Sequence, residues 1–480
     1  MRRVPFLALA IAGAALLASG CANTRVRDSG AINELITARG APAATWPEAS
    51  NKSTRNSDAD LIAAKTREPI TVKRAVEIAF LRSPAIRERY AELGISLADV
   101  IEAGEISNPT IAYTSLRPDE GGGPGQITRS ISLAFADLLF LPTRIRLANS
   151  NSEVVRDRVA ASLLELQGEV ESAWYEYVAT LQSLRMREAA ARAGEASAAY
   201  AKRLSDAGNL PPRALALELA GASEARIASA HAKADVSRAR AEFAALLGLS
   251  TRDSWEVAPS LPALPQHVET QDTLIETALG SRLDLLAVRR EVGVLESGLR
   301  LTRWWRWLGD FELGYERESE TDGARLSGPT FSLGVPLFNL NRSGVLRAEG
   351  QVERARVQLD QLELAVRNDI ALGLDRLETT REIVEAYRAA LIPQREAVSA
   401  RTLEEANFML SGAFEALEAK RKQYEAYGEY IEAVRDFWLA RVQLGLAVGG
   451  KLADDGATSE ILNLDEPAPK TAGDAHGDHK

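Results

Sequence analysis

The 480-residue sequence is poor in the residues on which most catalytic and metal sites are built. It has one cysteine, four histidines and three methionines, and only 6% of its residues are aromatic. It contains no HExxH or GxSxG motif, no phosphate-binding glycine-rich loop with lysine and no cysteine pair. His231 and His267 stand alone in the sequence. We therefore expect a chain that is not an enzyme and that holds no cofactor.

The sequence also lacks an excess of basic residues. The formal net charge is −10, which argues against nucleic acid as a partner because phosphate binding needs a basic face. A single cysteine excludes a disulfide within one chain, so the fold must be stable without one. Alanine, leucine, glutamate and arginine are abundant, a composition typical of long helices.

The N-terminus has the pattern of an export signal. Arg2 and Arg3 precede an apolar run over residues 6–17, and small residues lead to Cys21. The run is shorter than the roughly 20 residues that span a bilayer, although a retained N-terminal anchor is the alternative. Cleavage after residue 20 leaves Cys21 first. This segment resembles the lipobox of bacterial lipoproteins, with Ala18 where leucine is commoner, and it implies lipid attachment at Cys21. Residues 21–69 are expected to form an extended strap.

The rest of the chain contains one unit twice. Residues 131–135 (ISLAF) align with 331–335 (FSLGV), and residues 239–248 align with 440–449. These landmarks predict a first repeat over residues 70–250, a linker over 251–269, a second repeat over 270–452 and an acidic, disordered tail over 453–480. His476 and His479 in this tail suggest a weak divalent-metal site, and incidental histidines in a disordered tail are the alternative.

Each repeat is predicted to run helix, strand, strand, very long helix, helix. Thr71 is placed to N-cap a helix that runs to about Glu105. Residues 144–207 lack proline and carry apolar residues at spacings of three and four, which predicts a coiled-coil helix of roughly 100 Å. Pro393 is expected to kink the corresponding second helix. Gly208 and Gly412 are expected to end the two long helices as left-handed caps.

Four strands are predicted, at residues 110–116, 127–135, 310–318 and 329–337. Apolar residues such as Leu313 alternate with polar ones, so one face of the sheet is apolar. A sheet packed on a soluble core and a membrane β-barrel both fit this alternation. In a barrel, parity places Asp310, Glu312 and Glu316 in the lumen, although solvated charges on an ordinary sheet are the alternative. Three tryptophans lie where an aromatic belt would be: Trp304, Trp305 and Trp307.

Two hairpins cannot close a barrel, and an open sheet edge is not tolerated in hydrocarbon. Several chains must therefore share one barrel if the strands cross a membrane. A lipid-anchored periplasmic coiled-coil adaptor or scaffold, without membrane strands, is the alternative.

Three landmarks complete the pattern: Arg82-Ser83-Pro84, residues 335–339 (VPLFN) and residues 415–419 (EALEA). Over residues 71–452 the chain resembles the TolC-like outer-membrane efflux family, and residues 407–410 with 430–438 look like its heavy-metal and copper resistance branch. The resemblance implies a mainly α fold with membrane β structure. It also implies a homotrimer with four strands per chain in a twelve-stranded barrel, and a periplasmic helical tunnel. The chain would be a passive duct that works with a periplasmic adaptor and an inner-membrane pump, and metal cations are among its conceivable cargoes.

The resemblance also assigns roles to residues near the helical turns. The adaptor-contacting tips would be Gly208, Asn209 and Leu210 with Gly412, Ala413 and Phe414, and capping alone also explains both glycines. Glu415 and Glu418 would lie at a periplasmic constriction and favour cations. Acidic residues in the first turn of a helix also simply complement its dipole.

Overall fold

The computed structural model describes residues 29–44, 65–117, 119, 125–265, 269–305, 311–334, 340–450 and 452. The chain divides into two compact units. The sheet unit comprises residues 1–35, 88–160 and 283–362, and the helical unit comprises residues 36–87, 161–282 and 363–480. Each unit therefore takes segments from both predicted repeats, and two long helices run from one unit into the other.

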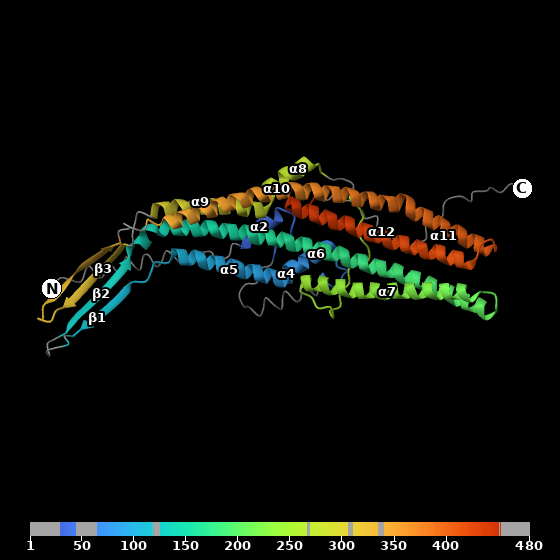
Figure 1. The fold of residues 1–480 in the computed structure, drawn as a ribbon, viewed down its shortest axis with the longest axis horizontal. Coiled ribbons are helices and arrows are strands. Elements are labelled where there is room, and N and C mark those ends of the chain that lie inside the picture. The colour runs from blue at the N-terminus through green and yellow to red at the C-terminus, as the bar shows by residue number, and fades with distance from the viewer. Residues whose placement is uncertain are drawn as a thin grey trace. The chain divides into compact units, whose positions relative to one another are not determined.

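The sheet unit holds four antiparallel strands in the order β1-β2-β3-β4 (Figure 1). They are β1 (Thr110–Leu116), β2 (Gln126–Ala134), β3 (Phe311–Ser319) and β4 (Arg325–Leu333). The first three agree with prediction to within one residue. The predicted start of β4 at residue 329 is wrong by four residues. The four missed residues include Gly328, a residue type that weakens a strand, and β4 also contains Pro329, which an edge strand tolerates.

The predicted single helix from residue 71 to 105 is two helices. Thr71 caps α4 (Val72–Arg82) as expected, because its side chain accepts a hydrogen bond from the Arg74 backbone at 3.4 Å. Helix α4 ends at Arg82, Ser83 is its C-cap, and α5 (Pro84–Gly104) begins at Pro84. The interruption arises because proline lacks a backbone donor and suits the first position of a new helix.

The very long helices are confirmed, with changed ends. Helix α6 (Phe135–Asp206) has 72 residues and starts nine residues before the predicted position 144, because it continues through Pro142. Helix α7 (Pro212–Leu247) returns from it. In the second half, α10 (Arg342–Ala386) passes through a π-helical turn, η2 (Tyr387–Leu391), into α11 (Ile392–Asn407). Pro393 lies in the first turn of α11, directly after this turn, so the expected irregularity is a π-turn.

Three further helices of the described chain are α8 (Gln271–Ser281), α9 (Leu283–Trp305) and α12 (Ala413–Val448). Among the described residues, no helix combines the length and the apolar character needed to cross a bilayer.

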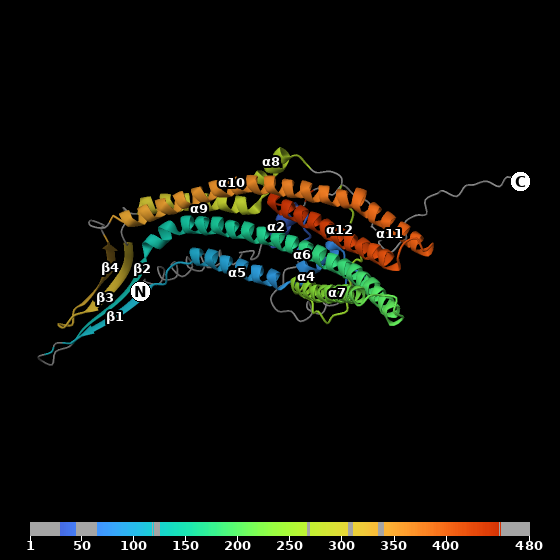
Figure 2. The same ribbon diagram turned by 45° about the vertical axis from the view of Figure 1, so that its right-hand side comes forward.

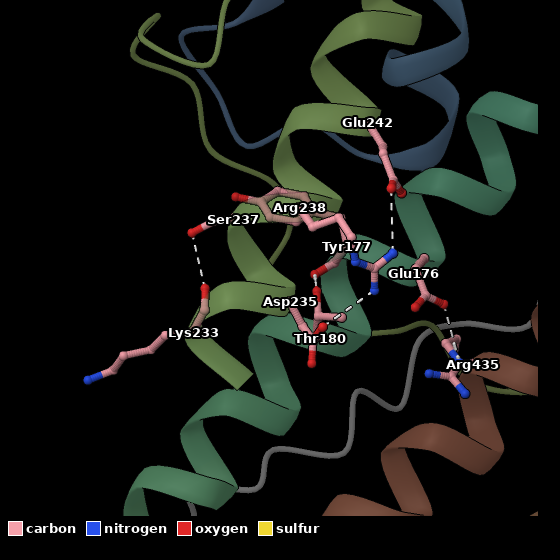
Figure 3. Close-up of polar contacts among 9 residues, drawn as sticks. All are labelled: Glu176, Tyr177, Thr180, Lys233, Asp235, Ser237, Arg238, Glu242 and Arg435. Atoms are coloured by element: carbon pink, nitrogen blue, oxygen red, sulfur yellow. Dashed lines mark hydrogen bonds and ion pairs between the residues drawn. The ribbon is translucent and has the colours of Figure 1, made fainter. Parts of the chain in front are cut away.

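The core of the helical unit joins residues from both halves of the sequence. Tyr175 of α6 stacks on Trp438 of α12 with ring centroids 5.0 Å apart, and the Trp438 indole donates to the Pro262 carbonyl at 3.1 Å. Beside them, Arg435 of α12 pairs with Glu176 of α6 at 3.4 Å (Figure 3). The segment 430–438, which carries the likeness to the heavy-metal branch, therefore contributes to packing between helices.

A short helix lies within the segment expected to be an extended strap. Helix α2 (Ser29–Thr37) presents Ile32 and Ile36, which are one turn apart, and both are buried. Beyond it, the Arg39 guanidinium donates to the Ser281 carbonyl at 2.8 Å. An extended form is therefore wrong for residues 29–37, since the i, i+4 spacing of the two isoleucines favours a helix that buries them together.

Candidate channel wall and hairpin tips

One face of the sheet is apolar and exposed. The strand register places Ile131 beside Ile111 and Tyr315, and it places Leu313 between Leu133 and Phe331. Ile111 is 77% exposed and Phe331 is 61% exposed. A sheet that packs on a soluble core buries such side chains. The predicted apolar face is therefore present, and the described part of the chain leaves it uncovered.

The opposite face is mainly polar, with Leu116 and Leu326 as its large apolar residues, and it carries every acidic residue of the four strands. Glu312 and Glu316 share this face, as parity predicts, and Glu318 lies on it too. The Gln126 amide donates a hydrogen bond to Glu318. Glu318 was not among the predicted lumen residues. It follows Glu316 by two positions in the same strand, so the same alternation also places it on this face. Asp310 lies outside the described residues.

Both outer strands have an open edge. Strand β1 pairs only with β2, and β4 pairs only with β3, within the part of the chain that the structure describes. Unpaired backbone donors and acceptors along an edge are a template for another strand. The sheet can therefore be extended on both sides by other copies of the chain.

The tryptophans of the predicted belt are only partly described. Trp304, near the end of α9 and before β3, is 67% exposed. The Trp305 side chain and Trp307 lie outside what the structure describes, as do the predicted lipidation site Cys21 and the tail histidines His476 and His479.

The first helical tip follows prediction. After α6, Gly208 has a positive φ of 77°, and the Asn209 backbone donates to the Leu204 carbonyl at 2.8 Å. A Cβ built on Gly208 meets nothing within 4 Å. Glycine is therefore favoured here by the left-handed backbone rather than by lack of space. Asn209 is exposed and Leu210 is half-buried.

The second tip differs from prediction. Gly412 is not a left-handed cap of α11, because its φ is −80° and it is the N-cap of α12. The positive φ, 61°, falls on Met409. The Leu410 backbone closes the turn by donating to the Glu405 carbonyl at 2.8 Å. The reason for the error is that the helix ends at Asn407, five residues before the glycine, so the turn closes without it.

This second tip also exposes apolar side chains that sequence reasoning did not assign to it. Phe408 is 70% exposed, Met409 is 92% exposed and Leu410 is 78% exposed. The signal for them is three consecutive large apolar residues directly after the end of a helix. Phe414, by contrast, packs against Tyr200 of α6 with ring centroids 5.2 Å apart, and Ala413 is the first residue of α12.

The two glutamates of the expected constriction have different surroundings. Glu415 is exposed in the first turn of α12. Glu418 accepts hydrogen bonds from the Arg421 guanidinium at 2.6 and 2.8 Å. The hydrogen bond from Arg421 lowers the pKa of the Glu418 carboxyl, although partial burial opposes this shift. The negative charge of Glu418 is thus offset by Arg421 in the same helix. Glu415 forms no ion pair among the described residues.

Solved structures of outer-membrane channels share this fold. The outer-membrane channel OprN superposes with a TM-score of 0.66 at 15% identity, over 81% of this chain and 92% of OprN. The CmeC outer membrane channel of Campylobacter jejuni gives 0.65 at 12% identity, over 88% of this chain and 93% of CmeC. CusC, whose crystal structures concern conformational changes accompanying folding and transmembrane channel formation, gives a TM-score of 0.65 at 12% identity, over 80% of this chain and 92% of CusC. These values lie so close together that no branch is singled out.

In sequence, the chain is 26% identical over 408 residues to protein CyaE of Bordetella pertussis, which covers 80% of this chain and 82% of CyaE. No protein-family profile matches the chain. The chain has the fold of the TolC-like outer-membrane channels, which confirms the resemblance drawn from its sequence landmarks. OprN, CusC and CmeC are outer-membrane or transmembrane channels, and the shared fold extends over about four fifths or more of this chain.

Proposed function

We propose that the chain is an outer-membrane efflux duct in which three copies each contribute the four strands β1–β4 to one twelve-stranded barrel. The observation that carries the proposal is the exposed apolar face of the sheet opposite a polar face that holds Glu312, Glu316 and Glu318. In a closed barrel the first face contacts lipid and the second lines a water-filled lumen. The open edges of β1 and β4 would pair between copies.

The alternative, a soluble periplasmic adaptor or scaffold, fits this sheet poorly. Such a protein would leave Ile111, Tyr113 and Phe331 in water, each more than half exposed. Burying a large apolar side chain contributes about 1.5–3 kcal/mol, so a soluble chain gains by covering them. Lipid provides that cover for the whole face at once.

The two tips are proposed as the contact with a periplasmic adaptor. At the first tip the candidates remain Gly208, Asn209 and Leu210. At the second tip the exposed trio Phe408, Met409 and Leu410 joins Gly412, Ala413 and Phe414. Because Phe414 packs on Tyr200, its role would be to hold the tip in shape while Met409 and Leu410 offer apolar surface. Crosslinking to an adaptor from Leu210 and Met409 in an assembled pump tests this, and the absence of a crosslink from both positions would contradict it.

Cations are the proposed cargo class. Three copies would bring nine strand glutamates into one lumen, and rings of carboxylates favour cations. At the tips, Glu415 would carry the negative ring more effectively than Glu418, because Arg421 offsets the charge of Glu418. The likeness of residues 407–410 and 430–438 to the heavy-metal branch supports metal cations within this class.

Lipidation at Cys21, following removal of residues 1–20, remains part of the proposal. It would tether the N-terminus to the same membrane that holds the strands. Mass spectrometry of the purified chain, with and without Cys21→Ser, tests the attachment.

Conductance in planar bilayers tests the duct. We expect the purified protein to run as a heat-dissociable trimer and to form cation-selective pores. The triple variant E312Q/E316Q/E318Q is expected to keep the pore and lose most of the selectivity. Arg325→Gln, on the opposite face of the sheet, is the matched control and should leave selectivity unchanged. A detergent-independent monomer without conductance would contradict the proposal.

A further inference from the structure

Arginine and glutamate side chains are sorted to opposite faces of the sheet. The register places Arg129, Arg317 and Arg325 on the apolar face, whereas the three strand glutamates share the polar face. No acidic residue of the four strands lies beside the arginines. On a sheet that faces water on both sides, opposite charges would gain by pairing across strands on one face. The arginines on the apolar face therefore have no acidic partner among the four strands.

Two of these arginines are direct neighbours. Arg129 of β2 and Arg317 of β3 are cross-strand partners, so their Cβ atoms lie about 4.5–5.5 Å apart. Both side chains are exposed. Like charges directly opposite each other repel, and an anion held between them reverses this repulsion. The Arg129 guanidinium also lies over the Tyr113 ring, 5.9 Å from its centroid, so an aromatic ring borders the pair.

The pair lies toward the hairpin end of the sheet. Helices α5, α6 and α9 join the strands at one end, and the hairpins close at the other (Figure 2). Along the apolar face, the row with Leu313 and Phe331 is followed by the row with Tyr315 and Pro329, and then by the Arg129–Arg317 row. Successive rows on one face are about 6.6 Å apart. The charges thus begin where the continuous apolar rows end.

This position matches the headgroup level of a bilayer. An arginine on the lipid face of a barrel is destabilising at the bilayer centre and nearly neutral at the interface, where tyrosine is also favoured. A neighbouring copy of the chain would not cover the pair, because Arg129 and Arg317 lie on the two central strands and copies would join at the edges β1 and β4.

We propose that Arg129 and Arg317, bordered by Tyr113, form a binding site for the phosphate group of an outer-leaflet lipid. The inference rests on the proposed function, because it requires the apolar face to lie in a bilayer. Guanidinium groups are suited to this ligand since each offers a planar fork of donors to phosphate oxygens. The lipid would fix the depth of the barrel in the membrane at this row.

Binding of a defined lipid to the purified trimer in neutral detergent tests the site. The probes are a bisphosphorylated lipid A, the same lipid without phosphates, and inorganic phosphate. We expect the trimer to bind the phosphorylated lipid, and R129Q/R317Q to bind it about 25-fold more weakly, or about fivefold per arginine, as is typical of one basic side chain at an anionic lipid surface. R129K/R317K should be intermediate, since lysine keeps the charge without the fork.

A charge-matched control uses R192Q/R401Q, which removes two exposed arginines from α6 and α11; it should bind the phosphorylated lipid like the wild type. Unchanged binding in R129Q/R317Q, equal binding of the lipid without phosphates, or inorganic phosphate binding as tightly as the lipid would each overturn the site. Conductance in bilayers of neutral lipid separates the two proposals. The R129Q/R317Q trimer should conduct like the wild type, and a wild-type protein that forms no pore would contradict the duct itself.

Discussion

The sheet and the helical unit differ in how far their large aromatic side chains are exposed. In the helical unit Phe437 and Phe243 are fully buried, and Phe243 packs against the rings of Tyr177 and Trp255. In the sheet, Phe331 and Ile111 are more than half exposed, although their strands are as regular as any in a soluble protein. The two regions contain similar residues, so their difference lies in what surrounds them.

This difference in exposure indicates what surrounds each region. The helical unit buries its own aromatic core, although it also exposes single apolar residues such as Leu217 and Leu403, and ion pairs join α6 to α7 and to α12. The sheet turns its apolar residues outward and keeps its glutamates on the other face, which fits lipid outside and water inside. Alternation alone does not distinguish these cases; exposure of the apolar face does.

The largest expected effect is in the helical core. Phe437→Ala removes a ring with no exposed surface, and it should destabilise the helical unit by about 3–5 kcal/mol because it leaves a cavity. Phe331→Ala in the sheet should change the stability of the helical unit by less than about 0.5 kcal/mol. Chemical denaturation in detergent, followed by helical circular dichroism, measures both. Equal losses for the two variants would break the comparison.

A smaller effect is expected from placing charge on the two faces of one strand. Phe331→Arg puts a charge toward lipid and should cost about 2–4 kcal/mol near the bilayer centre, which reduces the yield of heat-resistant trimers in membranes. Ser332→Arg, its neighbour on the polar face, is the control and should assemble normally. If Ser332→Arg were the more harmful variant, the two faces would have been assigned the wrong way round.

Much of this fold follows from the sequence, because its strongest signals are periodic. The apolar spacing of three and four residues predicted α6, and alternation predicted β3 and the face that carries Glu312 and Glu316. The start of β4 was missed because its first residues, 325–328, include Gly328, a residue type that weakens a strand, and they lie outside the stretch in which alternation was recognised. The break at Ser83 was missed although Pro84 predicts it, because a proline inside a helix removes a backbone donor and restricts the residue before it.

The turn at the second tip was the least predictable. Sequence rules assign a left-handed cap to glycine, but the φ of 61° falls on Met409 while Gly412 begins the next helix. Local preference was overridden because the backbone of Leu410 already closes the turn with Glu405. The exposed trio at this tip was also missed, because three consecutive apolar residues after a helix end are a signal only once the end of the helix is known.

The smallest effects sharpen a comparison within the helical unit, between its two tips. Gly208→Ala forces alanine into a left-handed conformation and should destabilise the α6–α7 hairpin by about 1 kcal/mol. Gly412→Ala has an ordinary φ and should cost less, a few tenths to about 1 kcal/mol for the lost N-cap preference. Met409→Gly should stabilise the second tip by about 0.5–1 kcal/mol, because glycine adopts its positive φ without strain. Thermal unfolding of the three variants against wild type measures these shifts, and a destabilising Met409→Gly would show that the methionine side chain has a packing role.

The most direct test of the central claim is the accessibility of spin labels placed one by one along β3 and β4 in membranes. We expect labels at positions 313, 315, 331 and 333 to collide with oxygen dissolved in lipid, and labels at 312, 316, 330 and 332 to collide with a water-soluble nickel complex. This alternation with a period of two residues is the result that the account predicts. Labels at 313, 315, 331 and 333 that are shielded from both reagents would place the apolar face against protein and would contradict it.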